Sequence, residues 1–179
     1  LREKNGVLDE FRKFKHEGLI KHICISTHMN GNEIEETLNN YDFDAILFGY
    51  SAMNFNYREK ALESTLKKRI GTVVMNPLGG GIIPKNPDIF SFLKTRSDET
   101  VVEAALRFLI DDERIHSSLV GFANQKDLKE ALNAVNGYKK IQEHKKALIK
   151  NNIREAFNQM CTSCGYCDYC PQQVPIPRL

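Results

Sequence analysis

Residues 32–50 read NEIEETLNNYDFDAILFGY, a helical pattern that runs directly into an apolar one. Ile34 and Leu38 lie four residues apart and predict a short amphipathic helix. The apolar run DAILFGY, residues 44–50, has the length and composition of a buried strand. This helix-strand unit recurs along the chain, and it therefore determines the fold class that the sequence predicts.

The same alternation is found on both sides of this stretch. Helices are predicted over residues 7–17, 58–68, 99–110 and 124–135, and strands over residues 22–26, 72–77 and 116–121. Short strands that each lead into a helix are typical of a parallel sheet covered by helices. The sequence therefore predicts an α/β fold with four parallel strands. An open doubly wound sheet and part of an eight-stranded TIM barrel both fit this pattern.

The composition is that of an ordinary globular chain. Of its 179 residues, 27% are charged and 41% are hydrophobic, which is enough for one sizeable core. The net charge of +2 argues against a nucleic-acid-binding surface. Charged residues fill the first turns, and no apolar run is long enough to span a bilayer. We expect a cytoplasmic protein that binds neither nucleic acid nor membranes.

Two segments depart from the repeating pattern. Residues 78–98 form a long connection with three consecutive glycines, and such connections in compact domains are usually functional. A longer polar helix is predicted over residues 139–160, with an apolar face of Ile141, Leu148, Ile149, Ile153 and Phe157. Because Asn136 and Gly137 indicate a helix stop, we divide the chain into residues 1–137 and residues 138–179.

Four cysteines lie close together near the end of the sequence, in CTSCGYCDYCP: Cys161, Cys164, Cys167 and Cys170. A disulfide framework is typical of small secreted proteins, which this chain does not resemble. A zinc site usually separates its two Cys-x-x-Cys pairs by more residues than are found here. A [4Fe-4S] cluster offers successive thiolates separate iron corners, so the spacing favours a cluster with these four ligands.

Cys170 is the least regular member of the set. The ferredoxin pattern has three residues before its last cysteine, and that cysteine can serve a second cluster. If Cys170 binds elsewhere, a fourth ligand and a second cluster would lie beyond Leu179. Cys24 falls inside a predicted strand, where we expect a small buried core residue.

The chain resembles the fifth to eighth strand-helix units of the aldo/keto reductase family in four ordered motifs: GLIKHICIST, FDAILFGYSAMN, RIGTVVMNPLGGG and TVVEAALRFLIDDERIHSSLVGFANQKDLKEALNAV. The cysteine tail resembles that of the iron-sulfur branch of this family. The resemblance implies the C-terminal half of a (β/α)8 barrel over residues 1–137, followed by a helical iron-sulfur tail over residues 138–179. It also implies a nicotinamide dinucleotide at the carboxyl ends of the strands.

The resemblance assigns roles to individual residues. Ser26 corresponds to the serine that binds the nicotinamide amide, with Thr27 beside it, and Met75 to a residue that stacks on the nicotinamide. Leu47 replaces a glutamine that completes the amide contact. The remaining cofactor-binding positions are Asn76, Pro77 and Leu78 at the pyrophosphate, Gly121 and Asn124 in a turn with free N–H groups for a phosphate, and Glu130 at the adenine.

The choice between NADP and NAD is left open at this stage. Asp127 stands where NADP-preferring relatives often carry a basic residue, and an acid there would repel a 2′-phosphate. Lys126 could take over the basic role. His28 follows the end of a predicted strand and would face the pocket.

The catalytic Asp, Tyr, Lys and His of the family come from its first four strands, which no part of this chain resembles. We therefore expect the chain to be the C-terminal half of a reductase for small carbonyl or alcohol substrates, inactive alone. The cluster would either exchange electrons with a redox partner protein or be structural. Exposed sheet edges could pair two copies into a homodimer. The alternative is an electron-carrier or binding protein in which only the iron-sulfur tail is active.

Overall fold

Four parallel strands form the central sheet of the computed structural model, which describes residues 6–156 and 171–172. The strands pair in chain order and are β1 (Cys24–Thr27), β2 (Ala45–Gly49), β3 (Gly71–Met75) and β4 (Ser117–Leu119). Each strand forms where the sequence predicts one. The prediction of an α/β fold with four parallel strands is therefore confirmed.

The longer helices alternate with the strands as predicted. They are α1 (Val7–His16), α2 (Gly31–Asn40), α3 (Phe55–Lys68), α5 (Val101–Ile110), α6 (Gln125–Asn136) and α7 (Glu143–Ala156). The predicted connection over residues 78–98 contains three short helical turns, η2 (Gly79–Gly81), α4 (Ile82–Lys85) and η3 (Ser91–Leu93). Local hydrogen bonds fix several starts: reciprocal capping boxes, for example, open α2 at Asn30 and α5 at Thr100.

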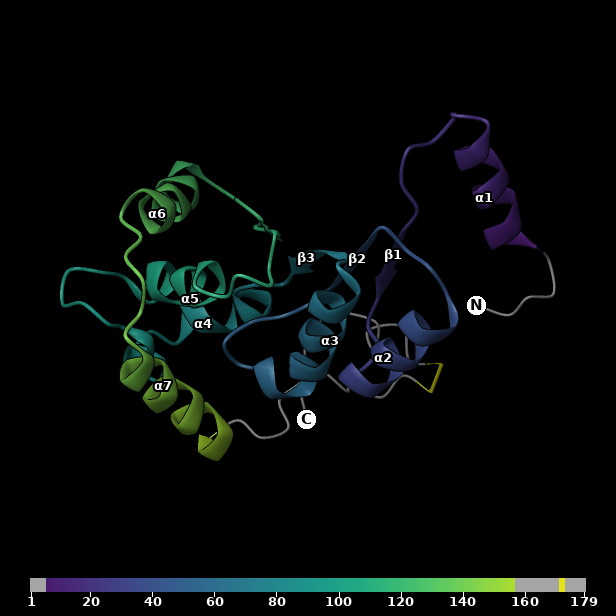
Figure 1. Ribbon diagram of the computed structural model, residues 1–179. Coiled ribbons are helices and arrows are strands. Elements are labelled where there is room, and N and C mark those ends of the chain that lie inside the picture. Colours follow the sequence, from purple (N-terminus) through teal and green to yellow (C-terminus); the bar gives the residue numbers. More distant parts are fainter. Residues whose placement is uncertain (1–5, 157–170, 173–179) are drawn as a thin grey trace.

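The main core lies between one face of the sheet and the helices that follow the strands. Ile46, Phe48 and Val74 point to this face and are at most 1% exposed. The helical side chains of the same core include Ile34, Leu38, Leu62, Ala105, Phe108, Ile149 and Ile153. Figure 1 shows α2 and α3 beside each other next to the strands. Helix α7 contributes to this core although it follows the predicted boundary at residue 137.

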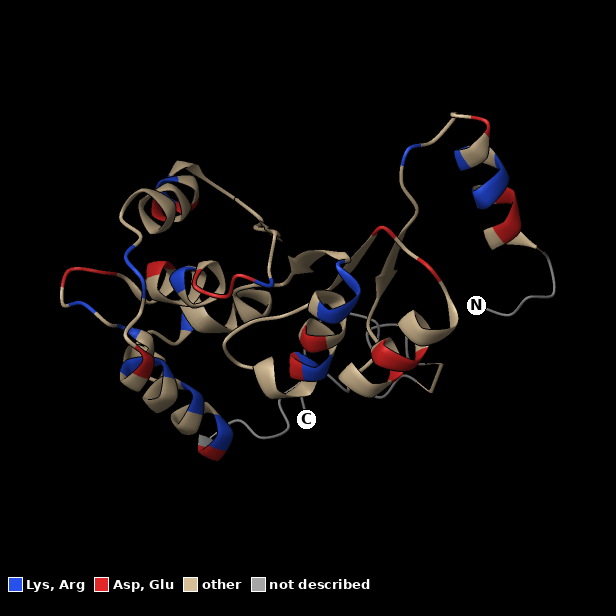
Figure 2. Ribbon diagram, viewed as in Figure 1, with Lys and Arg blue, Asp and Glu red and all other residues tan. Residues whose placement is uncertain are grey.

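The opposite face of the sheet is far less buried. The strand register places Ser26, Leu47, Val73 and Ser117 in one row across this face. Figure 2 shows that the strands carry no Lys, Arg, Asp or Glu. Cys24 lies two residues before Ser26 and therefore points to the same side, because side chains alternate along a strand. The expectation of a buried Cys24 is wrong, since this residue is exposed.

Helix α1 stands apart from the other helices, at the β1 end of the sheet (Figure 1). The helix forms over the predicted residues, but none of its side chains is buried. Val7 and Phe11 are 57% and 44% exposed. The ammonium group of Lys15 binds the carboxylate of Asp44 at 2.7 Å and ties α1 to the sheet. The apolar face of α1 is thus left open.

Asp111 anchors the segment that leads into α7. Its fully buried carboxylate accepts hydrogen bonds from the Tyr138 hydroxyl at 2.8 Å, the Ile141 N–H at 2.8 Å and the Lys146 ammonium at 2.7 Å. Burial raises the pKa of Asp111, but these donors outweigh burial and hold the pKa below its ordinary value. Helix α7 begins at Glu143 and not at the predicted residue 139, and Asp111 binds the chain just before it at Ile141.

Several sequence predictions fall outside the described residues. These are the cluster ligands Cys161, Cys164, Cys167 and Cys170, and Phe157 of the predicted helix face. Leu148 of the same face is described and is 59% exposed. In the described ranges, no group of His, Cys, Asp and Glu side chains is placed to hold a metal ion. Within residues 6–156 and 171–172, no helix has the length and apolar character that a membrane crossing requires.

Candidate functional site

A cavity of about 560 Å³ opens at the carboxyl ends of β2, β3 and β4. Its lining from the strand ends and the segments after them consists of His28, Gly49, Met75, Asn76, Pro77, Leu78, Gly80, Gly81, Pro84, Leu119, Val120 and Gly121. The helical lining is Val102 and Leu106 of α5 with Asp127 and Glu130 of α6. In parallel α/β folds, ligands bind at this end of the strands. The size is that of a small-molecule or cofactor site.

A glycine-rich turn forms one wall of the cavity. Gly79 has a φ of +60°, and a Cβ atom there would lie 2.3 Å from the sulfur of the buried Met53. Glycine is therefore needed at this position for both conformation and space. The side-chain amide oxygen of Asn76 accepts a hydrogen bond from the Gly80 N–H, and the Asn76 carbonyl accepts one from Gly79 at 3.0 Å. These bonds hold the turn against the end of β3.

Arg58 braces the wall at the β1 and β2 end. It is fully buried, and its guanidinium donates to the carbonyl of Gly49 at 3.1 Å and to that of His28 at 2.9 Å. Burial lowers the pKa of the His28 imidazole, and the neighbouring Arg58 charge lowers it further. His28 is therefore neutral at pH 7. The cavity wall at this end presents an uncharged ring.

The first two turns of α6 form another wall, and three backbone donors at the start of this helix are already engaged. Asn124 caps the helix as predicted, accepting from the N–H groups of Lys126 at 2.8 Å and Asp127 at 3.1 Å. The Asp127 carboxylate accepts from the Ala123 N–H at 2.9 Å. In the predicted turn over residues 121–125, the Ala123 N–H is thus bound by the chain's own Asp127, and the phosphate role of the turn stays a prediction.

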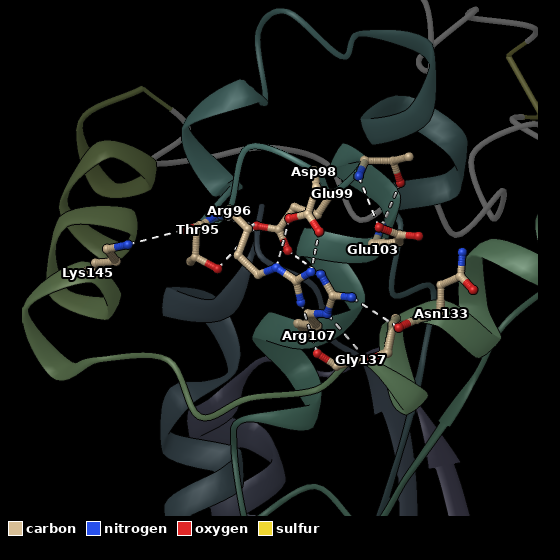
Figure 3. Close-up of polar contacts among 11 residues, drawn as sticks. Thr95, Arg96, Asp98, Glu99, Glu103, Arg107, Asn133, Gly137 and Lys145 are labelled. Atoms are coloured by element: carbon tan, nitrogen blue, oxygen red, sulfur yellow. Dashed lines mark hydrogen bonds and ion pairs between the residues drawn. The ribbon is translucent and has the colours of Figure 1, made fainter.

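A buried ion pair holds α6 in place, as Figure 3 shows. The guanidinium of Arg107 pairs with Glu99, and both side chains are at least 94% buried. Arg107 also donates to the carbonyls of Asn133 at 3.0 Å and Ala134 at 3.4 Å, near the end of α6. Because Arg107 lies on α5, this pair fixes the two helices that contribute to the cavity against each other.

Glu99 stays ionised in this buried position. Burial raises its pKa, but hydrogen bonds from the backbone N–H groups of Arg96 and Thr95 and from Arg107 together hold the pKa below its ordinary value. The Glu99 carboxylate thus joins the loop before α5 to Arg107 on that helix. A buried charge pair satisfied in this way is costly to break from one side.

The cavity brings together six of the nine predicted cofactor residues, namely Met75, Asn76, Pro77, Leu78, Gly121 and Glu130. Ser26 is exposed on the open face of the sheet. Thr27 is buried, and its hydroxyl accepts a hydrogen bond from the Met29 N–H at 3.0 Å. Asn124 caps α6. The roles given to these residues stay predictions.

Sequence reasoning missed the cavity's apolar side. Val102 and Leu106 of α5 line it, together with Leu119 and Val120 after β4. The signal was present in VVEAALRFLI, residues 101–110, which is apolar around nearly its whole circumference. A helix of that kind has a second face to cover besides the one that packs on the sheet.

The sequence profile of the aldo/keto reductase family matches residues 5–152. The chain belongs to this family. No curated protein sequence matches it.

Solved aldo/keto reductases share the fold. The holo form of an aldo-keto reductase from Bacillus halodurans superposes with a TM-score of 0.66 at 20% identity, covering 80% of this chain and 54% of that one. A thermostable aldo-keto reductase solved with the inhibitor epalrestat superposes with a TM-score of 0.65 at 17% identity, and the match covers 81% of this chain and 53% of that one. The aldose reductase of Schistosoma japonicum superposes with a TM-score of 0.60 at 18% identity, and the match covers 88% of this chain and 49% of that one. The chain spans about half the length of these reductases, and its fold matches part of their barrel.

Replacing Arg107 by Met is expected to lower the free energy of unfolding by about 3 kcal/mol, because Glu99 would remain buried without its cation. The double variant Arg107→Met, Glu99→Gln should recover part of this loss, since the buried carboxylate is gone. Urea denaturation measures both effects. The control is Asp98→Asn at the exposed neighbouring pair with Arg96, which should show no measurable change. The single variant Glu99→Gln completes the comparison. If the double variant loses as much free energy of unfolding as the two single variants added together, this account is contradicted.

Proposed function

We propose that this chain is the nicotinamide-binding part of an aldo/keto reductase-like oxidoreductase that acts on small carbonyl or alcohol substrates. The observation that carries the proposal is the cavity at the strand ends. Its lining includes six residues that the resemblance to the family had marked for the cofactor. Its volume of about 560 Å³ and its mixture of apolar walls with a few polar groups suit a dinucleotide.

The residues present fit an NADP or NAD molecule lying along the strand ends. In this placement the nicotinamide is near Met75, with Ser26 as the donor or acceptor for its amide. The pyrophosphate borders Asn76, Pro77 and Leu78, and the adenine lies at the α6 wall beside Glu130. Leu47 lies beside Ser26 on the neighbouring strand β2. Its apolar side chain cannot add the second hydrogen bond to the nicotinamide amide that a glutamine would make. The nicotinamide end is therefore held more weakly than in relatives with glutamine.

When bound, the dinucleotide supplies or accepts a hydride at its nicotinamide ring. The chain's own residues orient it: the apolar α5 wall excludes water, and the glycine-rich turn lets the backbone approach the ligand closely. Protonation of a carbonyl oxygen requires an acid group. The family supplies that acid from strands that this chain does not match, so the chain alone is expected to bind cofactor without turning over substrate.

Titration of NADH or NADPH with the full chain, followed by nicotinamide fluorescence, is expected to show saturable binding. The variant Gly121→Phe should weaken binding roughly tenfold or more by filling the cavity. It should not disturb the fold, since a Cβ at this position has no neighbour within 4 Å. Leu148→Phe on the exposed face of α7 is the matched control and should bind normally. Oxidation of NADPH by added aldehydes in the same samples would contradict the expected lack of turnover.

We further propose that Cys161, Cys164, Cys167 and Cys170 bind a [4Fe-4S] cluster that exchanges electrons with a redox partner protein. The support is their spacing, which places successive thiolates on successive iron corners. Helix α7 precedes these cysteines in the sequence and is anchored through Lys146 to Asp111 and through Lys145 to the Thr95 carbonyl. The second candidate function, an electron carrier with an inert barrel part, rests on the same spacing.

Anaerobically purified protein is expected to contain about four irons and about four acid-labile sulfides per chain. Cys164→Ser should lose both, whereas Cys24→Ser, outside the tail, should keep them. Cys170→Ser tests whether the last cysteine serves the same cluster. Zinc without sulfide would refute the cluster proposal. Iron and sulfide without any dinucleotide binding would favour the electron carrier.

Two copies of the chain are proposed to pair through their sheet edges. In the described part, β1 and β4 each pair on one side only. Pairing of β4 of one copy with β1 of the other would continue the sheet in the same parallel sense. Exposed apolar side chains are found at both ends of the sheet, on α1 with Val7 and Phe11 and on α6 with Leu132 and Val135.

Sedimentation equilibrium is expected to give a dimer for the unaltered chain. Leu132→Lys should shift the equilibrium toward monomer, because it would place a charge within the apolar contact. Leu66→Lys on α3, a site of similar exposure away from both edges, should leave the dimer intact. A stable monomer of the unaltered chain at all concentrations would refute the pairing.

A further inference from the structure

The α6 wall of the cavity is negatively charged. Asp127 and Glu130 line it from successive turns of the helix. The other described lining residues are apolar or small, apart from the Asn76 amide and the neutral His28 ring. No Lys or Arg is found among the lining residues that the structure describes. A negatively charged group lying at the α6 wall, away from Asn76, Pro77 and Leu78, would meet two carboxylates and none of these cations.

Asp127 cannot easily turn away from the cavity. Its carboxylate accepts the Ala123 N–H at 2.9 Å, and its own N–H is bound by the Asn124 cap at 3.1 Å. The side chain is thus tied to the loop before the helix and the backbone to the cap. The carboxylate is a fixed part of the wall.

The same bonds and the Asn124 cap occupy three of the N–H donors that a phosphate could use at the start of α6. Anions bind helix N-termini because free backbone N–H groups point at them. Here the N–H groups of Ala123, Lys126 and Asp127 donate to Asp127 and Asn124. Lys126, the nearest cation in the sequence, is exposed and does not line the cavity. The guanidinium of Arg58 lies at the far wall, bound to the carbonyls of His28 and Gly49.

We infer that the cavity selects NAD(H) over NADP(H), with Asp127 as the residue that discriminates between them. This inference rests on the proposed function, in which the adenosine end of the cofactor lies at the α6 wall. A ribose 2′-hydroxyl can donate a hydrogen bond to a carboxylate, which is how acidic residues recognise NAD in other dinucleotide sites. A 2′-phosphate carries nearly two negative charges and accepts hydrogen bonds only, so it is repelled.

The test compares the affinities of NADH and NADPH for the full chain, by nicotinamide fluorescence at low salt. The unaltered chain is expected to bind NADH roughly tenfold more tightly than NADPH. Asp127→Asn should bring the ratio close to one, because Asn keeps an oxygen acceptor for the Ala123 N–H but removes the charge. Glu36→Gln, an exposed acid on α2 that does not line the cavity, is the matched control and should keep the ratio.

The outcomes separate the inference from the function on which it rests. Equal affinities, or tighter binding of NADPH by the unaltered chain, would overturn the selectivity and leave the proposed function standing. A ratio unchanged in Asp127→Asn would remove Asp127 as the discriminating residue. Failure of both dinucleotides to bind would overturn the proposed function and the selectivity with it. The ratio should also shrink as sodium chloride is added, and a salt-independent ratio would refute the electrostatic basis.

Discussion

Parallel pairing of the four strands in chain order is the constraint on which the rest of the structure depends. It brings the carboxyl ends of all strands to the same edge of the sheet, so that segments far apart in the sequence meet there. The glycine-rich turn after β3 and the start of α6 after β4 line one cavity for this reason. The order and direction of the strands therefore place the cavity, and the individual side chains only line it.

Buried charges hold the parts that the sheet does not fix. Arg107 and Glu99 join α5, the loop before it and the end of α6, and Asp111 gathers three donors from the α7 segment. Each carboxylate is desolvated and is kept ionised by several hydrogen bonds. Such networks add little net stability over an apolar core but strongly penalise any other arrangement of the same groups. They therefore serve mainly to place α6 and α7 relative to the sheet.

The sequence could predict the elements but not the surroundings of their side chains. Cys24 has the pattern of a core residue, yet it lies on the open face of an edge strand and is exposed. The turn before α6 has the pattern of a phosphate-binding helix start, yet Asp127 and Asn124 bind three of the N–H groups in and after it. In both cases the local pattern was interpreted correctly as an element. The exposure of Cys24 depends on which face of the sheet the helices cover, whereas the donors before α6 are bound by side chains only two to four residues away.

The sequence by itself determined the alternation of strands and helices, the four parallel strands and the family. Hydrophobic periodicity is local, and local periodicity is enough to specify such elements. Only the tertiary structure decided that Val102 and Leu106 share a cavity with Met75 and Glu130, and that Arg107 reaches the end of α6. These contacts depend on the directions of side chains from separate elements, which become defined only when the sheet and its helices are packed together.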